Sequence, residues 1–317
     1  MNTPRRPTVA VLHGTDRPPR MDRVEARANV RYADATGFAE VLPGADIVFV
    51  WESRVPGLSR AWQEVDSVRW VHAAGAAVNH LLFPALRDSD VILTNARGVF
   101  DEPMAEYVLA LVLAFAKDLP TTLRLQQRRR WQHRETERLA GSSALIVGSG
   151  PIGRAIARKL AAVGVRSTGV GKFGRASDPD FVDIVPMSTL RDALSRHDYV
   201  IIAVPLTGDT AKLIDAAALR AMRPTARLIN LGRRGLVVTE DLIDALDSGV
   251  ISGAAIDVFA DEPLSPASPL WGMPNVMISP HMSGDVRGWR EELVRLFEEN
   301  LDRYITGRPL AGVVERR

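Results

Sequence analysis

The stretch ALIVGSGPIGRAIARKL, residues 144–160, indicates how the chain folds and what it binds. Four apolar residues typical of a buried strand are followed by Gly148, Gly150 and Gly153 in the spacing G-x-G-x-x-G, where a helix is expected to begin. The first glycine permits a tight turn, the second lets a pyrophosphate approach the backbone, and the third lets helix and strand pack closely. The helix N-terminus presents unpaired N–H groups to the phosphates. We therefore predict a dinucleotide-binding loop made of Gly148, Ser149, Gly150, Pro151, Ile152 and Gly153.

Apolar runs alternate with helix-compatible segments on both sides of this loop. The runs before it are TVAVLH, DIVFVW, VRWVHAAG and VILTNA, and those after it are RSTGVG, YVIIAV, RLINLG, SGAAIDV and NVMISPH. Helices are expected at 103–119, 151–163, 188–196, 215–222 and 239–248, with a final amphipathic helix in REELVRLFEENLDRYITG. Apolar strands that alternate with helices predict parallel sheets covered on both faces. The predicted fold class is α/β with doubly wound parallel sheets, and 317 residues suffice for two domains.

Composition narrows the classes of function. The chain is 46% apolar and 25% charged with a formal net charge of +2, which is ordinary for a soluble globular protein and gives no bulk affinity for polyanions. We interpret the arginine run at 128–130 as a solvated helix surface and predict no nucleic-acid partner. The chain has no cysteine, which excludes disulfides, a thiolate nucleophile and a Cys-ligated zinc site. Because no histidine cluster has metal-ligand spacing either, we predict no bound metal.

No segment has the features of a secretory signal or a membrane span. The N-terminal sequence MNTPRRPTVAVLHG lacks a long apolar region followed by a cleavage site. The longest apolar run, VLALVLAFA at 108–116, is about half as long as a membrane-crossing helix. We therefore expect a cytoplasmic protein without a membrane partner.

The second strand of the dinucleotide-binding unit leads into TGVGKFGR, residues 168–175, which contains no acid. An acid at the end of this strand commonly holds the ribose 2′-hydroxyl of NAD, and here Gly171 occupies that place. A small residue followed by the cations Lys172 and Arg175 suits a 2′-phosphate. We predict that the site favours NADP(H). The alternative is that both cations are solvated and that the site also accepts NAD(H).

Three stretches at the ends of later strands supply an arginine, an acid and a histidine. They are INLGRRGLV, AIDVFADEPLSPASPLW and ISPHMSG, and ligands of open α/β sheets bind at this edge. A forked guanidinium suits the carboxylate of a 2-oxo acid and polarises its carbonyl. An imidazolium donates a proton to the oxygen as hydride reaches the carbon, and a carboxylate beside it stabilises the charged ring. The set indicates reduction of a 2-oxo acid.

These stretches closely resemble the D-isomer-specific 2-hydroxyacid dehydrogenase family, and the resemblance extends over nearly the whole sequence. Further motifs in the family's order are VHAAGAAVNHL, NARGVFDEPMAEYVLALVLAF, VPLTGDT and FEENLDRYITGRPL. The resemblance implies two similar α/β domains, a Rossmann coenzyme domain inserted in a flavodoxin-like substrate domain. The expected bounds are 1–97 for the first part of the substrate domain, 98–284 for the dinucleotide-binding domain and 285–317 for a C-terminal helix that returns to the substrate domain.

The resemblance also implies a set of site residues. By position, Arg233 is the arginine that binds the substrate carboxylate, His281 is the acid/base and Glu262 is the partner of the histidine. The family has a glycine where this chain has Arg234. We expect Arg234 to point to solvent, with added charge near the cleft as the alternative. The loops beside the dinucleotide are predicted to contribute Val204, Pro205, Leu231, Gly232, Asp257 and Ser283.

The stretch GAAVN resembles the family's carboxylate-binding loop. Its predicted substrate contacts are Ala76, Ala77 and Val78. Ala77 replaces a usual glycine, which requires a backbone angle that suits a Cβ, and Asn79 replaces a usual aspartate in a structural role. His72 and His80 flank the loop and are interpreted as structural. Trp51 resembles a substrate-proximal position in the glyoxylate/hydroxypyruvate reductase branch, with simple packing as an equal alternative.

The activity implied is NAD(P)-dependent reduction of a small 2-oxo acid to the D-2-hydroxy acid, and the resemblance to the reductase branch favours glyoxylate or hydroxypyruvate. Phosphoglycerate dehydrogenase is the enzymatic alternative, weakened because the chain stops soon after the family's last helix. A dinucleotide-sensing co-repressor or scaffold is the alternative from another class. The helix 103–118 and the arm after it resemble the family's dimer-forming segment, so a homodimer is expected.

Overall fold

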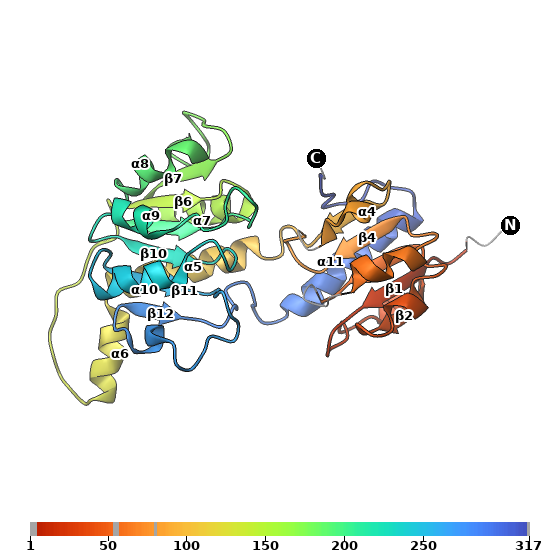
Figure 1. Cartoon of the computed structure of the whole chain (residues 1–317), viewed down its shortest axis with the longest axis horizontal. Coiled ribbons are helices and arrows are strands. Elements are labelled where there is room, and N and C mark those ends of the chain that lie inside the picture. The colour runs from red at the N-terminus through yellow and green to blue at the C-terminus, as the bar shows by residue number, and fades with distance from the viewer. Residues whose placement is uncertain (1–4, 53–56, 79–80, 316–317) are drawn as a thin grey trace. The chain divides into compact units, whose positions relative to one another are not determined.

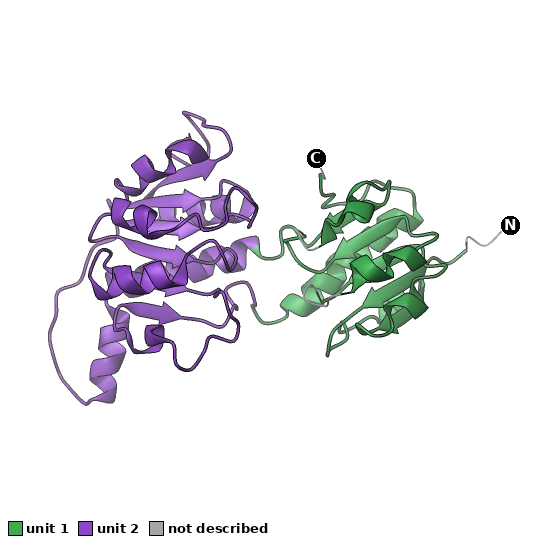
Figure 2. Ribbon diagram, in the orientation of Figure 1, with its two compact units in different colours: residues 1–100, 286–317 green, residues 101–285 purple. Residues whose placement is uncertain are grey.

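The chain forms two compact units. The computed structural model describes residues 5–52, 57–78 and 81–315. Unit 1 contains residues 1–100 and 286–317, and unit 2 contains residues 101–285 (Figure 2). Each unit is built on one parallel sheet with helices beside it (Figure 1). The predicted class, α/β with two parallel-sheet domains, is confirmed.

Unit 1 contains a five-stranded parallel sheet in the order β2-β1-β3-β4-β5. The strands are β1 (Thr8–Leu12), β2 (Asn29–Ala33), β3 (Ile47–Val50), β4 (Trp70–Ala73) and β5 (Ile92–Asn95). The four predicted apolar runs form β1, β3, β4 and β5. The sequence does not predict β2, because only Ala33 of this edge strand is fully buried. The short helices of unit 1 are α1 (Asp22–Glu25), α2 (Phe38–Val41), α3 (Leu58–Ala61), η1 (Trp62–Glu64) and α4 (Pro84–Arg87).

Helix α11 (Trp289–Ile305), from the C-terminal end of the chain, packs on the sheet that the N-terminal end forms (Figure 1). Its Phe297 side chain is fully buried and stacks on the Phe49 ring, with 4.1 Å between centroids. The Trp70 ring also stacks on the Phe297 ring, with 5.2 Å between their centroids. Large aromatic side chains contribute much of the burial in such a core, so α11 completes unit 1.

His72, on β4, is buried in the same aromatic cluster. Its Nδ1 lies 2.7 Å from Thr94 Oγ1, which also accepts the Trp70 Nε1–H at 2.7 Å. Within the described residues, His72 Nε2 has no hydrogen-bond partner. Burial lowers the pKa of His72 to about 3, because the charged ring would lose its hydration. The ring is therefore neutral at physiological pH.

This buried histidine should make unit 1 sensitive to acid. As pH falls through about 6.5, His72 binds a proton in the unfolded chain but stays neutral in the folded chain. The free energy of unfolding therefore falls. From pH 7 to pH 5 the loss should be about 2 kcal/mol. His72→Gln, which does not titrate, should reduce the pH-dependent loss by that amount in urea unfolding, whereas His133→Gln, at an exposed position, should not. An unchanged loss in His72→Gln would assign the acid sensitivity to other groups.

Unit 2 contains a seven-stranded parallel sheet in the order β12-β11-β10-β9-β6-β7-β8. The strands are β6 (Ser143–Val147), β7 (Arg166–Gly171), β8 (Ile184–Pro186), β9 (Tyr199–Ile202), β10 (Arg227–Asn230), β11 (Gly253–Ile256) and β12 (Val276–Ile278). The sequence does not predict β8, because three residues are too few to show a pattern. The strand order reverses at β6, between β7 and β9, and ligands of doubly wound sheets bind beside such a switch point.

The helices of unit 2 are α5 (Asp101–Ala116), α6 (Leu119–Gln127), α7 (Pro151–Ala162), η3 (Met187–Thr189), α8 (Leu190–Leu194), α9 (Ala216–Ala221), α10 (Thr239–Asp247) and η4 (Pro269–Gly272). The predicted helix 103–119 begins two residues earlier and ends at Ala116, because Asp118 has a left-handed backbone with φ +47° that separates α5 from α6. In the part of the chain that the structure describes, no helix has the length and apolar character that crossing a membrane requires.

Candidate active site

The loop between β6 and α7 fits the pyrophosphate group of a dinucleotide. Gly148 has φ +120°, and a Cβ there would lie 2.4 Å from the Ala203 carbonyl oxygen. A Cβ at Gly153 would lie 1.8 Å from the Gly148 carbonyl oxygen, so α7 can begin this close to the loop only if residue 153 is glycine. A Cβ at Gly150 would meet nothing within 4 Å, which leaves open space at the N-terminus of α7. Open space beside unpaired N–H groups is what a phosphate needs.

Ser149, in the same loop, lies against the end of β7. A Cβ at Gly171 would be 2.8 Å from Ser149 Oγ and 3.2 Å from Ile184 Cγ2, so an acid at position 171 would have to displace the serine hydroxyl. Lys172 follows as an exposed residue, with Nζ 5.6 Å from the centroid of the exposed Phe173 ring. The end of β7 thus combines the absence of an acid with an accessible cation.

Arg175, the second predicted cation, is held by an ion pair. Its Nη1 lies 3.0 Å from Asp178 Oδ2, and its backbone pairs with Ile184 in an isolated antiparallel bridge. The same carboxylate accepts two bonds from Arg154 on α7, at 2.7 and 2.9 Å. These bonds to Arg154 are the main reason why the pKa of the Asp178 carboxyl lies well below its usual range. Arg175 is therefore a positioned cation whose charge Asp178 partly offsets. The sequence does not predict this network, which also includes a bond from Arg154 to Asp180, because the two acids at 178 and 180 show no pattern that links them to α7.

His281 and Glu262 form a pair in unit 2. His281 Nδ1 lies 3.1 Å from both Oε1 and Oε2 of Glu262. The Glu262 side chain is 15% exposed and that of His281 is 36% exposed, so the histidine is the more accessible partner. Glu262 Oε1 also accepts the Phe259 N–H at 3.2 Å, which fixes the orientation of the carboxylate. Because Nδ1 faces Glu262, Nε2 is the ring nitrogen that can face a substrate.

Asp257, directly after β11, binds the segment that contains His281. Its Oδ1 accepts the Ser279 hydroxyl at 2.6 Å and the Met282 N–H at 3.0 Å, and its Oδ2 accepts the Ser283 N–H at 3.0 Å. Asp257 is 2% exposed, and Ser283 is also buried. These two residues, both predicted to contact the dinucleotide, are therefore engaged with each other inside unit 2.

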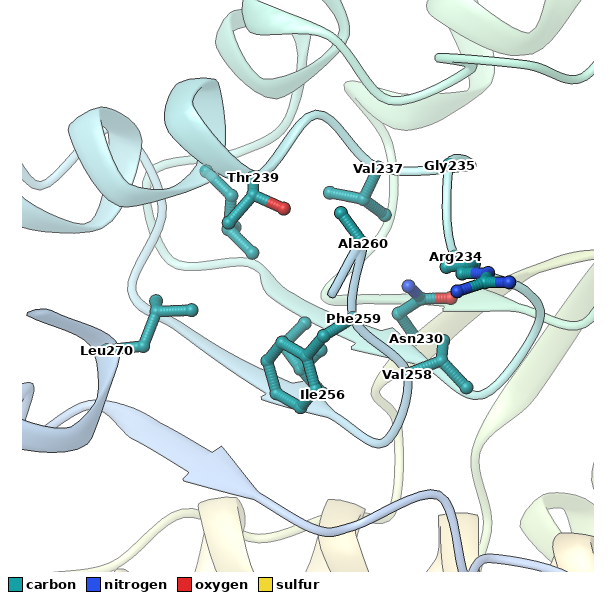
Figure 3. Close-up of a pocket in the computed structure, with 11 residues that line it drawn as sticks. Asn230, Arg234, Gly235, Val237, Thr239, Ile256, Val258, Phe259, Ala260 and Leu270 are labelled. Atoms are coloured by element: carbon teal, nitrogen blue, oxygen red, sulfur yellow. The ribbon is translucent and has the colours of Figure 1, made fainter. Parts of the chain in front are cut away.

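The two arginines after β10 differ in their surroundings. Arg233 is half-buried, and its Nη1 donates to the Gly232 carbonyl oxygen at 2.7 Å. Arg234 is exposed, and it lines a pocket beside Asn230 and Val258 (Figure 3). The other lining residues are Gly235, Val237, Thr239, Leu242, Ile256, Phe259, Ala260 and Leu270. Arg234 is thus both accessible to solvent and adjacent to the loop that follows β11.

The remaining predicted dinucleotide contacts lie at the carboxyl edge of the same sheet. Val204 and Pro205 come shortly after β9, and Leu231 and Gly232 come directly after β10. The Gly232 N–H donates to Asn230 Oδ1 at 3.2 Å. Since β6 and β9 are neighbours and all seven strands are parallel, these residues share one edge with the loop 148–153. Among the described residues, no group of three or more histidines and acids is arranged to hold a metal ion.

Of the predicted substrate contacts, Trp51 and the loop residues 76–78 belong to unit 1, whereas Arg233 and His281 belong to unit 2. Trp51 is buried, with the Phe49 ring 5.8 Å away and the Arg290 guanidinium 5.5 Å above its ring. The loop after β4 is held where the Asn95 side chain donates to the Ala76 carbonyl oxygen at 2.6 Å. Ala77 is not among the described residues with positive φ, so the replacement of glycine by alanine is accommodated here. Val78, the last predicted contact of this loop, is buried. Asn79 and His80, which were predicted to be structural, lie outside the described residues.

A doubly wound sheet with a glycine-rich loop and a histidine–carboxylate pair at its carboxyl edge is an arrangement that suits a nicotinamide-dependent oxidoreductase. A family model described as "D-isomer specific 2-hydroxyacid dehydrogenase, NAD binding domain" matches residues 109–283, more than half of the chain. The chain belongs to the D-isomer-specific 2-hydroxyacid dehydrogenase family, and it is an NAD(P)-dependent enzyme that interconverts 2-oxo and D-2-hydroxy acids.

Individual relatives narrow the resemblance. Glyoxylate reductase of Thermofilum pendens is 30% identical over 244 residues, which cover 75% of this chain and 72% of that protein. The structure of an NADPH-dependent glyoxylate/hydroxypyruvate reductase from Sinorhizobium meliloti, in complex with NADP and sulfate, matches with 28% identity and a TM-score of 0.80 over 98% of this chain and 99% of that one. D-3-phosphoglycerate dehydrogenase of Synechocystis sp. is 27% identical over 280 residues, 87% of this chain and 50% of that protein. The predicted resemblance to the family, and within it to the glyoxylate/hydroxypyruvate reductase branch, is confirmed.

Proposed function

We propose that the protein is an NADPH-dependent reductase that converts a small 2-oxo acid into the D-2-hydroxy acid. The observation that carries the proposal is the His281–Glu262 pair, in which both carboxylate oxygens lie 3.1 Å from Nδ1. Glyoxylate and hydroxypyruvate are the proposed substrates, because the relatives from T. pendens and S. meliloti are named for them.

The residues of this chain divide the work of the reaction. Bound reduced nicotinamide supplies the hydride. Arg233 binds the substrate carboxylate through its forked guanidinium and polarises the 2-oxo group. His281, held at Nδ1 by Glu262, donates the proton on Nε2 to the carbonyl oxygen, and Glu262 stabilises the protonated ring. In the reverse direction Nε2 accepts the hydroxyl proton, so reduction consumes one proton and oxidation releases one.

Preference for NADPH rests on the end of β7, where Gly171 leaves no carboxylate to repel a 2′-phosphate and Lys172 is exposed. With glyoxylate and hydroxypyruvate, kcat/KM should be higher for NADPH than for NADH at matched concentrations. A hydrogen bond to a charged group contributes about 1.5–3 kcal/mol, so Lys172→Ala should lower kcat/KM for NADPH roughly tenfold or more. Arg175→Ala should have a smaller effect, because Asp178 offsets the charge of this arginine.

The control for these cofactor variants is Arg220→Ala, which removes an exposed arginine from α9. It should leave the ratio of NADPH to NADH use unchanged. Equal use of both dinucleotides by the unaltered enzyme would contradict the proposed preference, and the missing acid at position 171 would then be merely tolerated.

Two other functions have testable signatures. The Synechocystis relative favours phosphoglycerate dehydrogenase, which would oxidise D-3-phosphoglycerate and would have little activity on glyoxylate. A dinucleotide-sensing co-repressor or scaffold would bind NAD(P)(H) without turning over any 2-oxo acid. Rates measured with D-3-phosphoglycerate, glyoxylate and hydroxypyruvate, together with fluorescence titration of NADPH, separate the three functions.

We also propose that the protein is a homodimer. Support comes from the segment after α5, where Leu119, Leu123 and Trp131 are exposed apolar side chains. The chain from 130 to 139 forms neither helix nor strand, as a connecting arm does (Figure 1). A second copy that covered these side chains would remove their apolar surface from water. Sedimentation equilibrium should give twice the 34.7 kDa mass of one chain, and a single-chain mass would contradict the proposal.

A further inference from the structure

The segment that contains His281 is bound on both sides of the histidine by one carboxylate. Asp257 accepts the Ser279 hydroxyl two residues before His281, and it accepts the backbone N–H groups of Met282 and Ser283 directly after it. The distances are 2.6, 3.0 and 3.0 Å. Because Asp257 is 2% exposed, water does not compete effectively for these bonds.

His281 itself has a backbone conformation that needs external support. Its φ is +55°, in the left-handed region, which costs a residue with a Cβ about 1–2 kcal/mol. Such a conformation persists when the surrounding structure determines it. The hydrogen bonds that Asp257 accepts from the residues on either side of His281 supply this constraint. They fix the backbone of His281, and the contact between Nδ1 and Glu262 then orients the ring.

We propose that Asp257 is a positioning residue for the acid/base, which holds the 279–283 segment so that the His281 ring meets Glu262 and the substrate together. This inference rests on the proposed function of His281. It assigns to Asp257 a role different from the dinucleotide contact that the family resemblance implies, and the three hydrogen bonds to the segment, which involve both carboxylate oxygens, support this role.

Asp257→Asn tests the proposal at nearly constant side-chain volume. The amide has one oxygen in place of two. Its NH₂ group must therefore face at least one of the three groups that donate to Asp257, and that hydrogen bond is lost. A shift of about 1 Å in a catalytic group costs roughly 10²-fold in rate. We therefore expect hydride transfer to slow roughly 10²-fold. The rate is measured from the loss of NADPH fluorescence in a single turnover at saturating NADPH and glyoxylate. The dissociation constant of NADPH should stay within about twofold of the original value.

Ser279 provides a milder pair of variants that keeps the charge of Asp257. Ser279→Ala removes one of the three bonds and should slow hydride transfer less than Asp257→Asn does, whereas Ser279→Thr keeps a hydroxyl and should largely restore the rate. The matched control is Asp198→Asn, because Asp198 accepts the Ser143 N–H and hydroxyl at 2.9 and 2.8 Å at the opposite edge of the same sheet. This control should lower stability and leave hydride transfer unchanged.

The outcomes separate this inference from the proposed function. Weaker NADPH binding by Asp257→Asn, with hydride transfer unchanged at saturation, would overturn the positioning role and assign Asp257 to the dinucleotide. Normal rates in both Asp257→Asn and Ser279→Ala, beside an inactive His281→Ala, would overturn the inference alone. A fully active His281→Ala would instead overturn the proposed function.

Discussion

His281→Ala should lower the rate of 2-oxo acid reduction by roughly 10²- to 10⁴-fold, the range that a positioned general acid contributes. The variant removes the ring whose Nδ1 lies 3.1 Å from both oxygens of Glu262, so no group remains to protonate the carbonyl oxygen. NADPH binding should change little, because the dinucleotide loop lies between β6 and α7. Steady-state rates with glyoxylate and hydroxypyruvate, together with fluorescence titration of NADPH, check both expectations.

His133→Ala serves as the control for this loss, since it removes an exposed histidine from the arm between α6 and β6. It should keep the full rate. Turnover in His281→Ala comparable with that of the original enzyme would mean that another group or water protonates the substrate. The His281–Glu262 pair would then be structural.

Arg233→Lys should lose most of its turnover although it keeps the positive charge. A lysine cannot form the two parallel bonds with a carboxylate that a guanidinium forms, so the substrate loses both its orientation and the polarisation of its 2-oxo group. Removing one donor of this kind from an active site costs roughly 10²- to 10³-fold in kcat. We expect a loss of this size in kcat/KM for glyoxylate.

The neighbouring residue supplies the matched comparison, because Arg234→Lys makes the same chemical change one position further along the chain. Arg234 is exposed at the pocket of Figure 3, so this variant should retain nearly normal kinetics. The opposite pattern, a normal Arg233→Lys and an impaired Arg234→Lys, would transfer the carboxylate-binding role to Arg234.

The sequence predicts the α/β class and most of the strands because buried parallel strands form continuous apolar runs, as in β1, β6 and β9. It fails for β2 and β8, which lie at sheet edges and bury too few residues to form such a run. The glycine spacing predicts the dinucleotide loop for a steric reason that the structure makes explicit. A Cβ at Gly148 or Gly153 would lie within 2.4 Å of a backbone oxygen.

Pairings between distant side chains were beyond the reach of the sequence alone. The ion pair of Arg175 with Asp178 and the bonds of Asp257 to Ser283 depend on how loops fold back, and no local pattern encodes that. The pairing of Glu262 with His281 was inferred from family resemblance, and nothing in the spacing of 19 residues between them would have indicated it.

The placement of α11 has a consequence for the order of events during synthesis. Unit 2 is one continuous segment, so none of it depends on residues that are translated after residue 285. Unit 1 differs, because the rings of Phe49 and Trp70 are covered by Phe297, which is translated only after all of unit 2. The aromatic face formed by the first hundred residues therefore stays uncovered until α11 has been synthesised. Exposed apolar surface of this kind is what chaperones bind.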